Sequence, residues 1–338
     1  MSLNRVVVEL GERSYPVIIG HGARSELNNV LPLSAKRAVI VTQRNIPFNI
    51  EVNIPVTVVF IGDGEDHKSL SVIEEVSQAF AKASLTRRDV IIGVGGGMVT
   101  DVAGFAAASW HRGTPVVHIA TSLVGMIDAA IGGKTGVNLP QGKNLVGAFW
   151  QPVAVLCDLD ALSTLPEREM RCGFGEMAKY HFLTGDDLLA LDQPTRIARC
   201  IEIKAKIVSS DERESGLRAV LNYGHTLAHA IEISTKFRVA HGESVAIGMV
   251  FAAHLAQVLG RIDKQRVGQH YAVIRDTYGL DVELPSDSSH LELLDLMSTD
   301  KKAINGLTFV LDGQAGIETV TGISRENVLE AFRLMELP

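Results

Sequence analysis

Short runs of β-branched and other apolar residues recur through the first half of the chain, separated by segments in which apolar positions have helical spacing. The runs have the length and composition of strands that are buried on both faces. The segment 69–85 between two of them has helical periodicity, and Ser69 or Ser71 suits its N-cap. This alternation predicts a mostly parallel sheet with helices on both sides. The expected strands span 37–42, 56–62, 89–95, 115–121 and 152–158.

The pattern changes after about residue 166, where helical periodicity becomes continuous. Helices are expected at 168–183, 195–212, 217–234 and 244–260. We therefore predict an α/β N-terminal Rossmann-like domain at 1–166 and a mainly α-helical C-terminal domain at 167–338. Ligands of such parallel sheets bind at the carboxyl ends of the strands.

Composition narrows the class of protein. With 338 residues, 46% of them hydrophobic and 21% charged, the chain suits two globular domains. A formal net charge of −7 argues against nucleic-acid binding. Cys157, Cys172 and Cys200 form no C-x-x-C pair, which argues against a disulfide framework and fits a reducing compartment. The most apolar stretch, 90–110, is interrupted by glycines and Asp101, so we expect a cytoplasmic protein rather than a membrane protein.

Two glycine turns follow expected strands. The turn at 93–97 opens a helical pattern, where close backbone approach and free N–H groups favour a pyrophosphate, although a tight strand-to-helix turn is the alternative. The turn at 62–65 carries Asp63 and Glu65, whose carboxylates suit ribose hydroxyls as in dinucleotide sites. Its alternative is an ordinary surface turn.

Three histidines, His225, His229 and His241, lie within seventeen consecutive positions. Together with a carboxylate such as Glu176, they suit a catalytic zinc ion with an open coordination position, and cobalt suits the same ligands. His225 and His229 lie one helical turn apart and are the pair that spacing favours, but spacing does not decide which two histidines bind. Buried, hydrogen-bonded core histidines are the alternative.

Basic residues gather in glycine-rich loops and in the helical half. Lys134 and Lys143 lie in loops from which an ammonium group can reach a phosphate. Lys179 follows Glu176 at i+3, a spacing that surface ion pairs also show. The P-loop pattern is not in register, which argues against a nucleoside triphosphatase. Further basic candidates are Lys204, Arg218, Lys301 and Lys302.

Long ordered motifs carry a resemblance that covers nearly the whole chain. They are GDGEDHK, GGGMVTDVAGFAAASWHRG, IDAAIGGKTGVN, GKNLVGAFWQP, GFGEMAKY, EIKAKIVSSDERESGLRAVLNYGHTLAHAIE and HGESVAIGM. In these motifs the chain resembles the 3-dehydroquinate synthases of the sugar phosphate cyclase superfamily. The resemblance implies a phosphate-eliminating lyase of the shikimate pathway and aromatic amino acid biosynthesis. Such an enzyme converts 3-deoxy-D-arabino-heptulosonate 7-phosphate to 3-dehydroquinate and phosphate with recycled NAD and a divalent metal.

The resemblance also implies roles for individual residues. The implied metal ligands are Glu176, His225 and His241, so that His229 contacts substrate instead. The implied NAD contacts are Asp63, Glu65, Lys68, Gly96, Gly97, Met98, Asp101, Thr121, Ser122, Asp128, Lys134, Lys143 and Thr164. The implied substrate contacts are Lys134, Asn144, Lys179, Lys204, Arg218, Asn222, His229 and Lys301. Arg112 matches a residue that reaches the substrate phosphate of the neighbouring subunit in a homodimer.

One position departs from the family pattern, and three rival functions compete with the resemblance. The family usually has two threonines where this chain has Thr121 and Ser122, and Ser122 retains the hydroxyl. A 2-deoxy-scyllo-inosose or 2-epi-5-epi-valiolone synthase is the nearest rival, but Asn222 and His229 agree with the dehydroquinate pattern. A metal-dependent glycerol or alcohol dehydrogenase would not need the anion-binding lysines and would release NADH. A non-catalytic NAD sensor should have lost metal or lysine positions, which are intact here.

Overall fold

The computed structural model describes residues 3–299 and 306–336, and the chain divides into two compact units. The first unit comprises Met1–Pro166 and Asp192–Arg213, and the second comprises Glu167–Leu191 and Glu214–Pro338. A single division at residue 166 would place helix α5 (Gln193–Ser210) with the helical half. Instead, α5 packs against strand β1 and helix η5 of the first unit. The structure therefore differs from the expected division at one helix, α5, which packs with the first unit.

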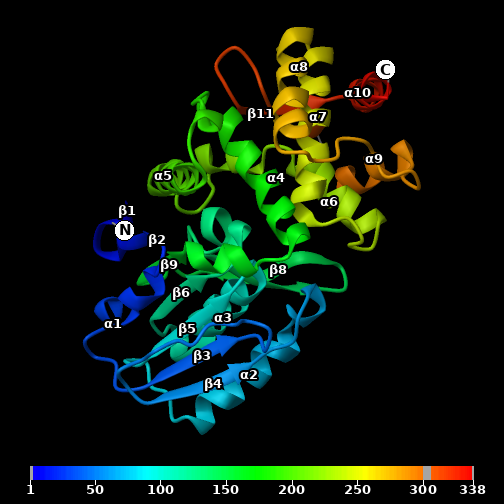
Figure 1. The fold of residues 1–338 in the computed structure, drawn as a ribbon. Coiled ribbons are helices and arrows are strands. Elements are labelled where there is room, and N and C mark those ends of the chain that lie inside the picture. The colour runs from blue at the N-terminus through cyan, green and yellow to red at the C-terminus, as the bar shows by residue number, and fades with distance from the viewer. Residues whose placement is uncertain (1–2, 300–305, 337–338) are drawn as a thin grey trace. The chain divides into compact units, whose positions relative to one another are not determined.

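A seven-stranded sheet forms the centre of the first unit, in the order β1-β2-β9-β6-β5-β3-β4 (Figure 1). Neighbouring strands are parallel except for the antiparallel pair β1 and β2. The strands are β1 Asn4–Val8, β2 Tyr15–Gly20, β3 Ala38–Thr42, β4 Val56–Phe60, β5 Val90–Gly95, β6 Val116–Ala120 and β9 Ala154–Asp158. The mostly parallel sheet expected from the sequence is thus confirmed.

The edge strand β4 differs from the expectation that all five runs are buried on both faces. Val56, Val58 and Phe60 are 43%, 44% and 48% exposed. The reason is topological, because β4 pairs only with β3 and ends the sheet on that side. The other four expected strands lie inside the sheet and are buried along their length.

Alternate residues of the strands build a core on each face of the sheet. Val39 and Ile91 pack with helices α2 and α3, whereas Ile40 and Ile92 pack with residues of the opposite face. The Ser69 hydroxyl caps α2 by accepting the Val72 N–H at 3.5 Å, as one of the two expected N-caps would. The remaining elements of this unit include α1 Leu27–Val30, α2 Leu70–Lys82, α3 Gly97–Ser109, η5 Gly125–Ala129, and a hairpin of β7 Lys134–Leu139 and β8 Gly142–Phe149.

The second unit is mainly helical, as expected, with a two-stranded hairpin that the sequence reading missed. The expected helix over 217–234 is interrupted, because Gly224 has a φ of +81°, which separates the 3-10 helix η8 from α6. The elements are α4 Glu167–Thr184, η8 Leu217–Asn222, α6 His225–Ser234, α7 His241–Val258, α8 Lys264–Tyr271, α9 His290–Thr299, β10 Leu307–Leu311, β11 Glu318–Ile323 and α10 Arg325–Met335. Over the described residues, no helix has both the length and the apolar character needed to cross a membrane.

Glycines let the helices of this unit meet backbone to backbone. A Cβ added to Gly175 of α4 would lie 2.0 Å from the carbonyl oxygen of Gly242 in α7. A Cβ on Gly242 would lie 1.8 Å from the carbonyl oxygen of Cys172. Glu176 follows Gly175, and His241 precedes Gly242. The close contact of the two helices therefore holds Glu176 and His241 near each other.

Candidate functional site

A buried carboxylate and two imidazoles meet in the second unit. Glu176 on α4, His225 at the start of α6 and His241 at the start of α7 each offer a ligand atom, and these atoms all lie within 4.8 Å of one another. The Nε2 atoms of His241 and His225 lie 3.0 and 3.4 Å from the same Glu176 oxygen, Oε1. Two nitrogens and one carboxylate oxygen form the donor set of a catalytic zinc or cobalt site.

The opposite nitrogen of each ring has its own acceptor. His225 Nδ1 lies 3.1 Å from the carbonyl oxygen of Tyr223, and His241 Nδ1 lies 3.4 Å from Glu232 Oε1. With a proton on Nδ1, each ring would satisfy its acceptor and leave its Nε2 lone pair for a metal ion. The two acceptors therefore favour the tautomer that a metal ligand requires.

His229 lies near this cluster but is not part of it. Its ring centroid lies 5.7 Å from that of His225 and 6.3 Å from that of His241. Among the described residues, the group of converging ligand atoms contains His241 and not His229. Helical spacing alone favours His225 with His229, whereas the converging atoms belong to Glu176, His225 and His241, the three residues that the resemblance implies as ligands; that they bind a metal stays a prediction.

The cluster holds its charges out of water. Burial raises the pKa of Glu176, but the charges of Lys179 and His225 outweigh it and bring the pKa well below the ordinary value. Burial lowers the pKa of His241, yet hydrogen bonds to Glu176 and Glu232 raise it overall to about 9. Burial also lowers the pKa of His225. Two buried carboxylates thus favour positive charge at His241, and the residues present fit a divalent cation.

The second unit also holds further candidate substrate residues, of which Lys179 contacts the cluster directly. Lys179 and Arg218 are each 1% exposed, and Lys179 Nζ lies 2.6 Å from Glu176 Oε2. Asn222 donates a hydrogen bond of 2.6 Å to Glu214, a carboxylate that the sequence reading did not single out. Glu214 has a φ of +57°, and such strain in a non-glycine residue often marks a functional position. Lys301 lies outside the described residues.

The first unit places its glycine turn between β5 and α3. Gly95 ends the strand, Gly96 is the N-cap and Gly97 begins the helix, whose first N–H groups have no partner within it. A Cβ on Gly96 would lie 2.9 Å from Ser122 Oγ, so the hydroxyl lies directly against the turn. Thr121 donates its backbone N–H to Gly95 at 2.9 Å, and Met98 packs partly buried against the core.

Lys68, which follows the turn at 62–65, meets an acid of helix α3 and an amide of strand β8. Lys68 Nζ forms an ion pair with Asp101 and donates to Asn144 Oδ1 at 2.6 Å. Burial raises the pKa of Asp101, and Lys68 opposes that shift. Glu65 accepts a hydrogen bond from Asn138 at 2.8 Å, and Asp63 is exposed in the same turn. Lys68, Asp101 and Asn144, all predicted to contact NAD or substrate, are therefore brought together although they are far apart in the sequence.

Lys204 lies in the first unit rather than in the helical half. It extends from α5 to η5, where its Nζ bonds the Asp128 backbone oxygen at 2.6 Å and also pairs with the Asp128 carboxylate. Lys134 begins β7 and Lys143 lies near the start of β8. Arg112 is exposed in a turn with a φ of +63°. The predicted residues thus fall into two groups, one in each unit.

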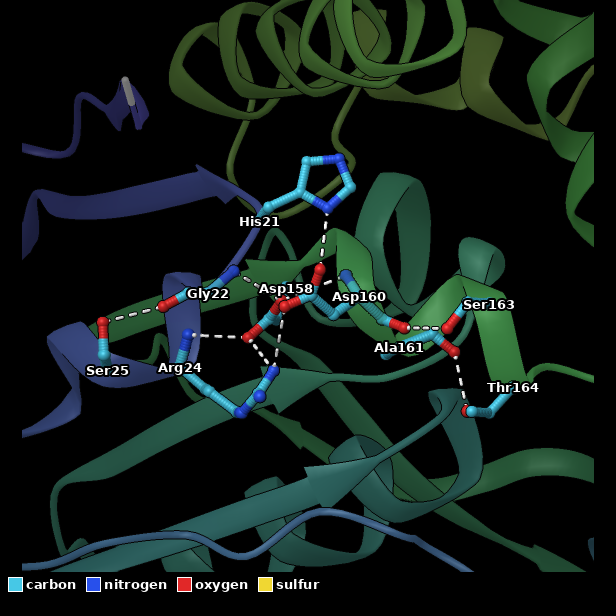
Figure 2. Close-up of polar contacts among 9 residues, drawn as sticks. All are labelled: His21, Gly22, Arg24, Ser25, Asp158, Asp160, Ala161, Ser163 and Thr164. Carbon is cyan, nitrogen blue, oxygen red and sulfur yellow. Dashed lines mark hydrogen bonds and ion pairs between the residues drawn. The ribbon is translucent and has the colours of Figure 1, made fainter. Parts of the chain in front are cut away.

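Figure 2 shows how the carboxyl ends of β2 and β9 are fastened near Thr164. The buried Asp158 carboxylate accepts the backbone N–H of Gly22 at 3.0 Å and of Arg24 at 3.1 Å, and it pairs with the Arg24 guanidinium at 2.6 Å. Thr164 donates its hydroxyl to the Ala161 carbonyl oxygen at 3.1 Å. Asp158 also accepts the Asp160 N–H at 3.1 Å and so caps the 3-10 helix Leu159–Thr164, an anchoring role that was not evident from the sequence.

Known proteins share both this fold and these motifs. A protein described as a putative aminodehydroquinate synthase, from Amycolatopsis mediterranei (strain S699), is 50% identical over 331 residues, which cover 98% of this chain and 94% of that protein. A 3-dehydroquinate synthase from Mycobacterium leprae (strain TN) is 42% identical over 325 residues, which cover 89% of each. The structure of a 2-deoxy-scyllo-inosose synthase complexed with carbaglucose-6-phosphate, NAD+ and Co2+ has a TM-score of 0.87 at 24% identity. It covers 98% of this chain and 99% of that one.

Family models cover most of the chain in two consecutive parts. The model for the N-terminal part of 3-dehydroquinate synthases matches residues 58–172. The model for the C-terminal part matches residues 173–303. The junction between them lies within α4, a few residues before Glu176. The chain belongs to the 3-dehydroquinate synthase family.

Proposed function

We propose that this chain is a 3-dehydroquinate synthase, a lyase that converts 3-deoxy-D-arabino-heptulosonate 7-phosphate to 3-dehydroquinate and phosphate. The observation that carries the proposal is the buried cluster of Glu176, His225 and His241, with Lys179 beside it. This set suits a sugar phosphate cyclase because it offers a metal site next to a buried anion-binding group. The NAD+ and Co2+ bound to the structural relative support NAD and a divalent metal here, with zinc as the expected ion.

The two units have different proposed roles. The first unit binds NAD through its glycine turn and the residues around Lys68 and Asp101, and the second holds the metal. A metal held by Glu176, His225 and His241 would supply polarisation of a substrate hydroxyl, and NAD at the glycine turn would supply reversible hydride transfer. The chain's own task is to bind the substrate's carboxylate and phosphate, to orient its ring and to exclude water.

Charged side chains supply the binding and proton-handling groups of the proposal. Lys179 and Arg218 are buried cations suited to the anionic groups of the substrate. Asn222 holds the Glu214 carboxylate at 2.6 Å, which places a proton acceptor beside a proposed substrate contact. His229, outside the ligand cluster, is proposed to orient a hydroxyl or to handle a proton. Arg112 is proposed to reach the partner's substrate in a homodimer.

A second candidate function is that of an aminodehydroquinate synthase, because one similar relative is described as a putative enzyme of that kind. The same assay tests it. The putative aminodehydroquinate synthase is more similar to this chain, at 50% identity, than the 3-dehydroquinate synthase reported above at 42%. An amino analogue differs from the proposed substrate at one ring substituent, so the same metal and anion sites suit both. Only relative rates on the two substrates separate these functions.

The test mixes the metal-loaded protein with substoichiometric NAD and either 3-deoxy-D-arabino-heptulosonate 7-phosphate or its amino analogue. Many turnovers of phosphate release without net NADH, with 3-dehydroquinate as the product, are expected for the first substrate. Faster turnover of the amino analogue would favour the second candidate. Phosphate release from neither substrate would refute both, and steady NADH accumulation on a polyol would indicate a dehydrogenase.

A further inference from the structure

A second buried carboxylate lies beside the proposed metal site and has no role in the proposed chemistry. Glu232 on α6 is 1% exposed, and its neighbour Ile231 is fully buried. Glutamate is almost never fully buried unless it is paired, because desolvating a carboxylate is costly. A specific partner is therefore required, and the structure identifies one on α7.

That partner is the outer nitrogen of His241. Glu232 Oε1 lies 3.4 Å from His241 Nδ1, while His241 Nε2 lies 3.0 Å from Glu176 Oε1. The two nitrogens point to different sides of the imidazole ring, so an ion at Nε2 is out of reach of Glu232. In agreement, the converging ligand atoms found among the described residues belong to Glu176, His225 and His241. Glu232 is thus a neighbour of a ligand rather than a ligand.

Helix geometry explains why α6 supplies both kinds of residue. Glu232 lies seven positions after His225, which is two helical turns, so both residues lie on the same side of α6. This side faces α7, with which α6 is in close contact. Gly248 of α7 permits the approach, since a Cβ there would lie 2.0 Å from the Gly224 carbonyl oxygen. The contact between α6 and α7 therefore places both Glu232 and His225 next to His241.

The two histidines differ in what supports them. A backbone carbonyl, that of Tyr223, lies 3.1 Å from His225 Nδ1, whereas a carboxylate, that of Glu232, lies 3.4 Å from His241 Nδ1. A carboxylate acceptor makes the ring a better electron donor as well as fixing its orientation. It also balances part of the positive charge that a divalent cation would bring into the buried site.

We propose that Glu232 is a positioning residue of the metal site, holding His241 with its proton on Nδ1 and its Nε2 lone pair directed at the ion. The inference rests on the proposed function, because it assumes that Glu176, His225 and His241 bind a divalent metal. It adds a residue that acts on metal affinity through His241.

The test compares full-length wild type with Glu232→Gln, using the zinc dissociation constant from chelator competition and the visible spectrum of the Co2+-loaded protein. The variant retains the size of the side chain and removes its charge. Zinc affinity is expected to fall about 10–100-fold, as is typical when such partners are lost. The Co2+ bands are expected to shift even at saturating cobalt, a change that a purely structural role would not produce.

Glu292→Gln is the matched control. It makes the same exchange at an exposed position of α9. Its zinc affinity is expected to match the wild type. If Glu232→Gln does not fold, Glu232→Asp retains the charge but withdraws the oxygens, and a smaller loss of zinc affinity is expected.

The outcomes separate the two hypotheses. Wild-type zinc affinity and an unchanged Co2+ spectrum in a folded Glu232 variant would overturn the role of Glu232 and leave the proposed function intact. A wild-type protein that binds neither Zn2+ nor Co2+ stoichiometrically would instead refute the metal site on which the proposed function depends.

Discussion

The two units build their candidate sites in different ways. In the first unit, many candidate residues lie at turns and at the ends of elements around a sheet whose two cores consist of apolar side chains, and several, such as Asp63 and Glu65, are exposed. In the second unit, Glu176, Lys179 and Arg218 lie inside the helical core, at 0%, 1% and 1% exposure. A site on turns can change with little effect on the fold, whereas a site inside a core cannot.

Buried charge exists in the first unit too, but it is paired locally. Lys68 and Lys204 are 5% and 4% exposed, and each contacts a carboxylate of its own unit, Asp101 and Asp128 respectively. In the second unit, three helices must meet before Glu176, His225 and His241 come together. Folding and site assembly are therefore the same event there, and the following predictions test that difference.

The largest effect is expected for Glu176→Gln. The substitution removes a proposed metal ligand and takes a carboxylate charge from Lys179, whose Nζ lies 2.6 Å away. Breaking one side of a buried pair costs about 3–5 kcal/mol. Urea unfolding of the metal-free protein should show that loss, together with lost zinc binding and turnover. The control Glu292→Gln removes the same charge at an exposed position of α9 and should leave stability, zinc binding and turnover close to those of the wild type.

A somewhat smaller effect is expected for Gly242→Ala. The added Cβ would meet the Cys172 carbonyl oxygen at 1.8 Å, so α4 and α7 must separate. Overpacking of this kind costs about 3 kcal/mol at the upper end of its usual range, and zinc affinity should fall with it because Glu176 moves away from His241. Gly268→Ala in α8 meets no atom within 4 Å and should stabilise the protein by about 0.5–1 kcal/mol. Equal effects of the two variants on unfolding would contradict this account of the helix contact.

His118 tests whether a buried histidine of the first unit makes the stability of that unit sensitive to acid. It is 2% exposed in β6, and burial lowers its pKa to about 4. The unfolded chain, with a histidine pKa of about 6.5, then binds more protons between these values, so stability is complete above about pH 6.5 and falls as the pH drops toward 4.

Between about pH 7.5 and 4.5 this one group should cost about 2–3 kcal/mol. His118→Leu removes the titrating group, so its urea midpoint should fall less over the same interval than that of the wild type. If both proteins lose the same free energy of unfolding, the neutral histidine does not contribute to the acid sensitivity of the first unit.

Sequence patterns predicted interior elements better than edges and junctions. The runs that became β5 and β6 were recognisable because both faces of each strand are covered. The run 56–62 has a similar apolar composition, but whether a strand lies inside a sheet or at its edge depends on strand order, which periodicity does not contain. For the same reason, the helical pattern at 195–212 did not reveal that α5 packs with the sheet-containing unit.

The candidate site shows a similar limit. Spacing favours His225 and His229, because it reports only which residues share a helix face. His241 joins the cluster through the contact of α4 with α7, which depends on Gly175 and Gly242 and on long-range packing. The ordered motifs that carry the family resemblance include His241, whereas helical periodicity does not indicate which histidines converge. Glu232 was missed since a single acid in an amphipathic helix looks like any solvated charge.

The smallest effect is expected for Ser122→Ala, in a turn of the first unit. Ser122 Oγ accepts the Gly125 N–H at 3.2 Å, and losing such a cap costs about 1 kcal/mol. The proposed NAD affinity should weaken by no more than roughly fivefold, the equivalent of that energy, because the glycine turn itself is unchanged. Ser122→Thr retains the hydroxyl and serves as the control, with both constants measured by urea unfolding and by titration with NAD. A loss of stability near that of Glu176→Gln would mean that the turns of the first unit are as integral to its fold as the buried helices are to the second.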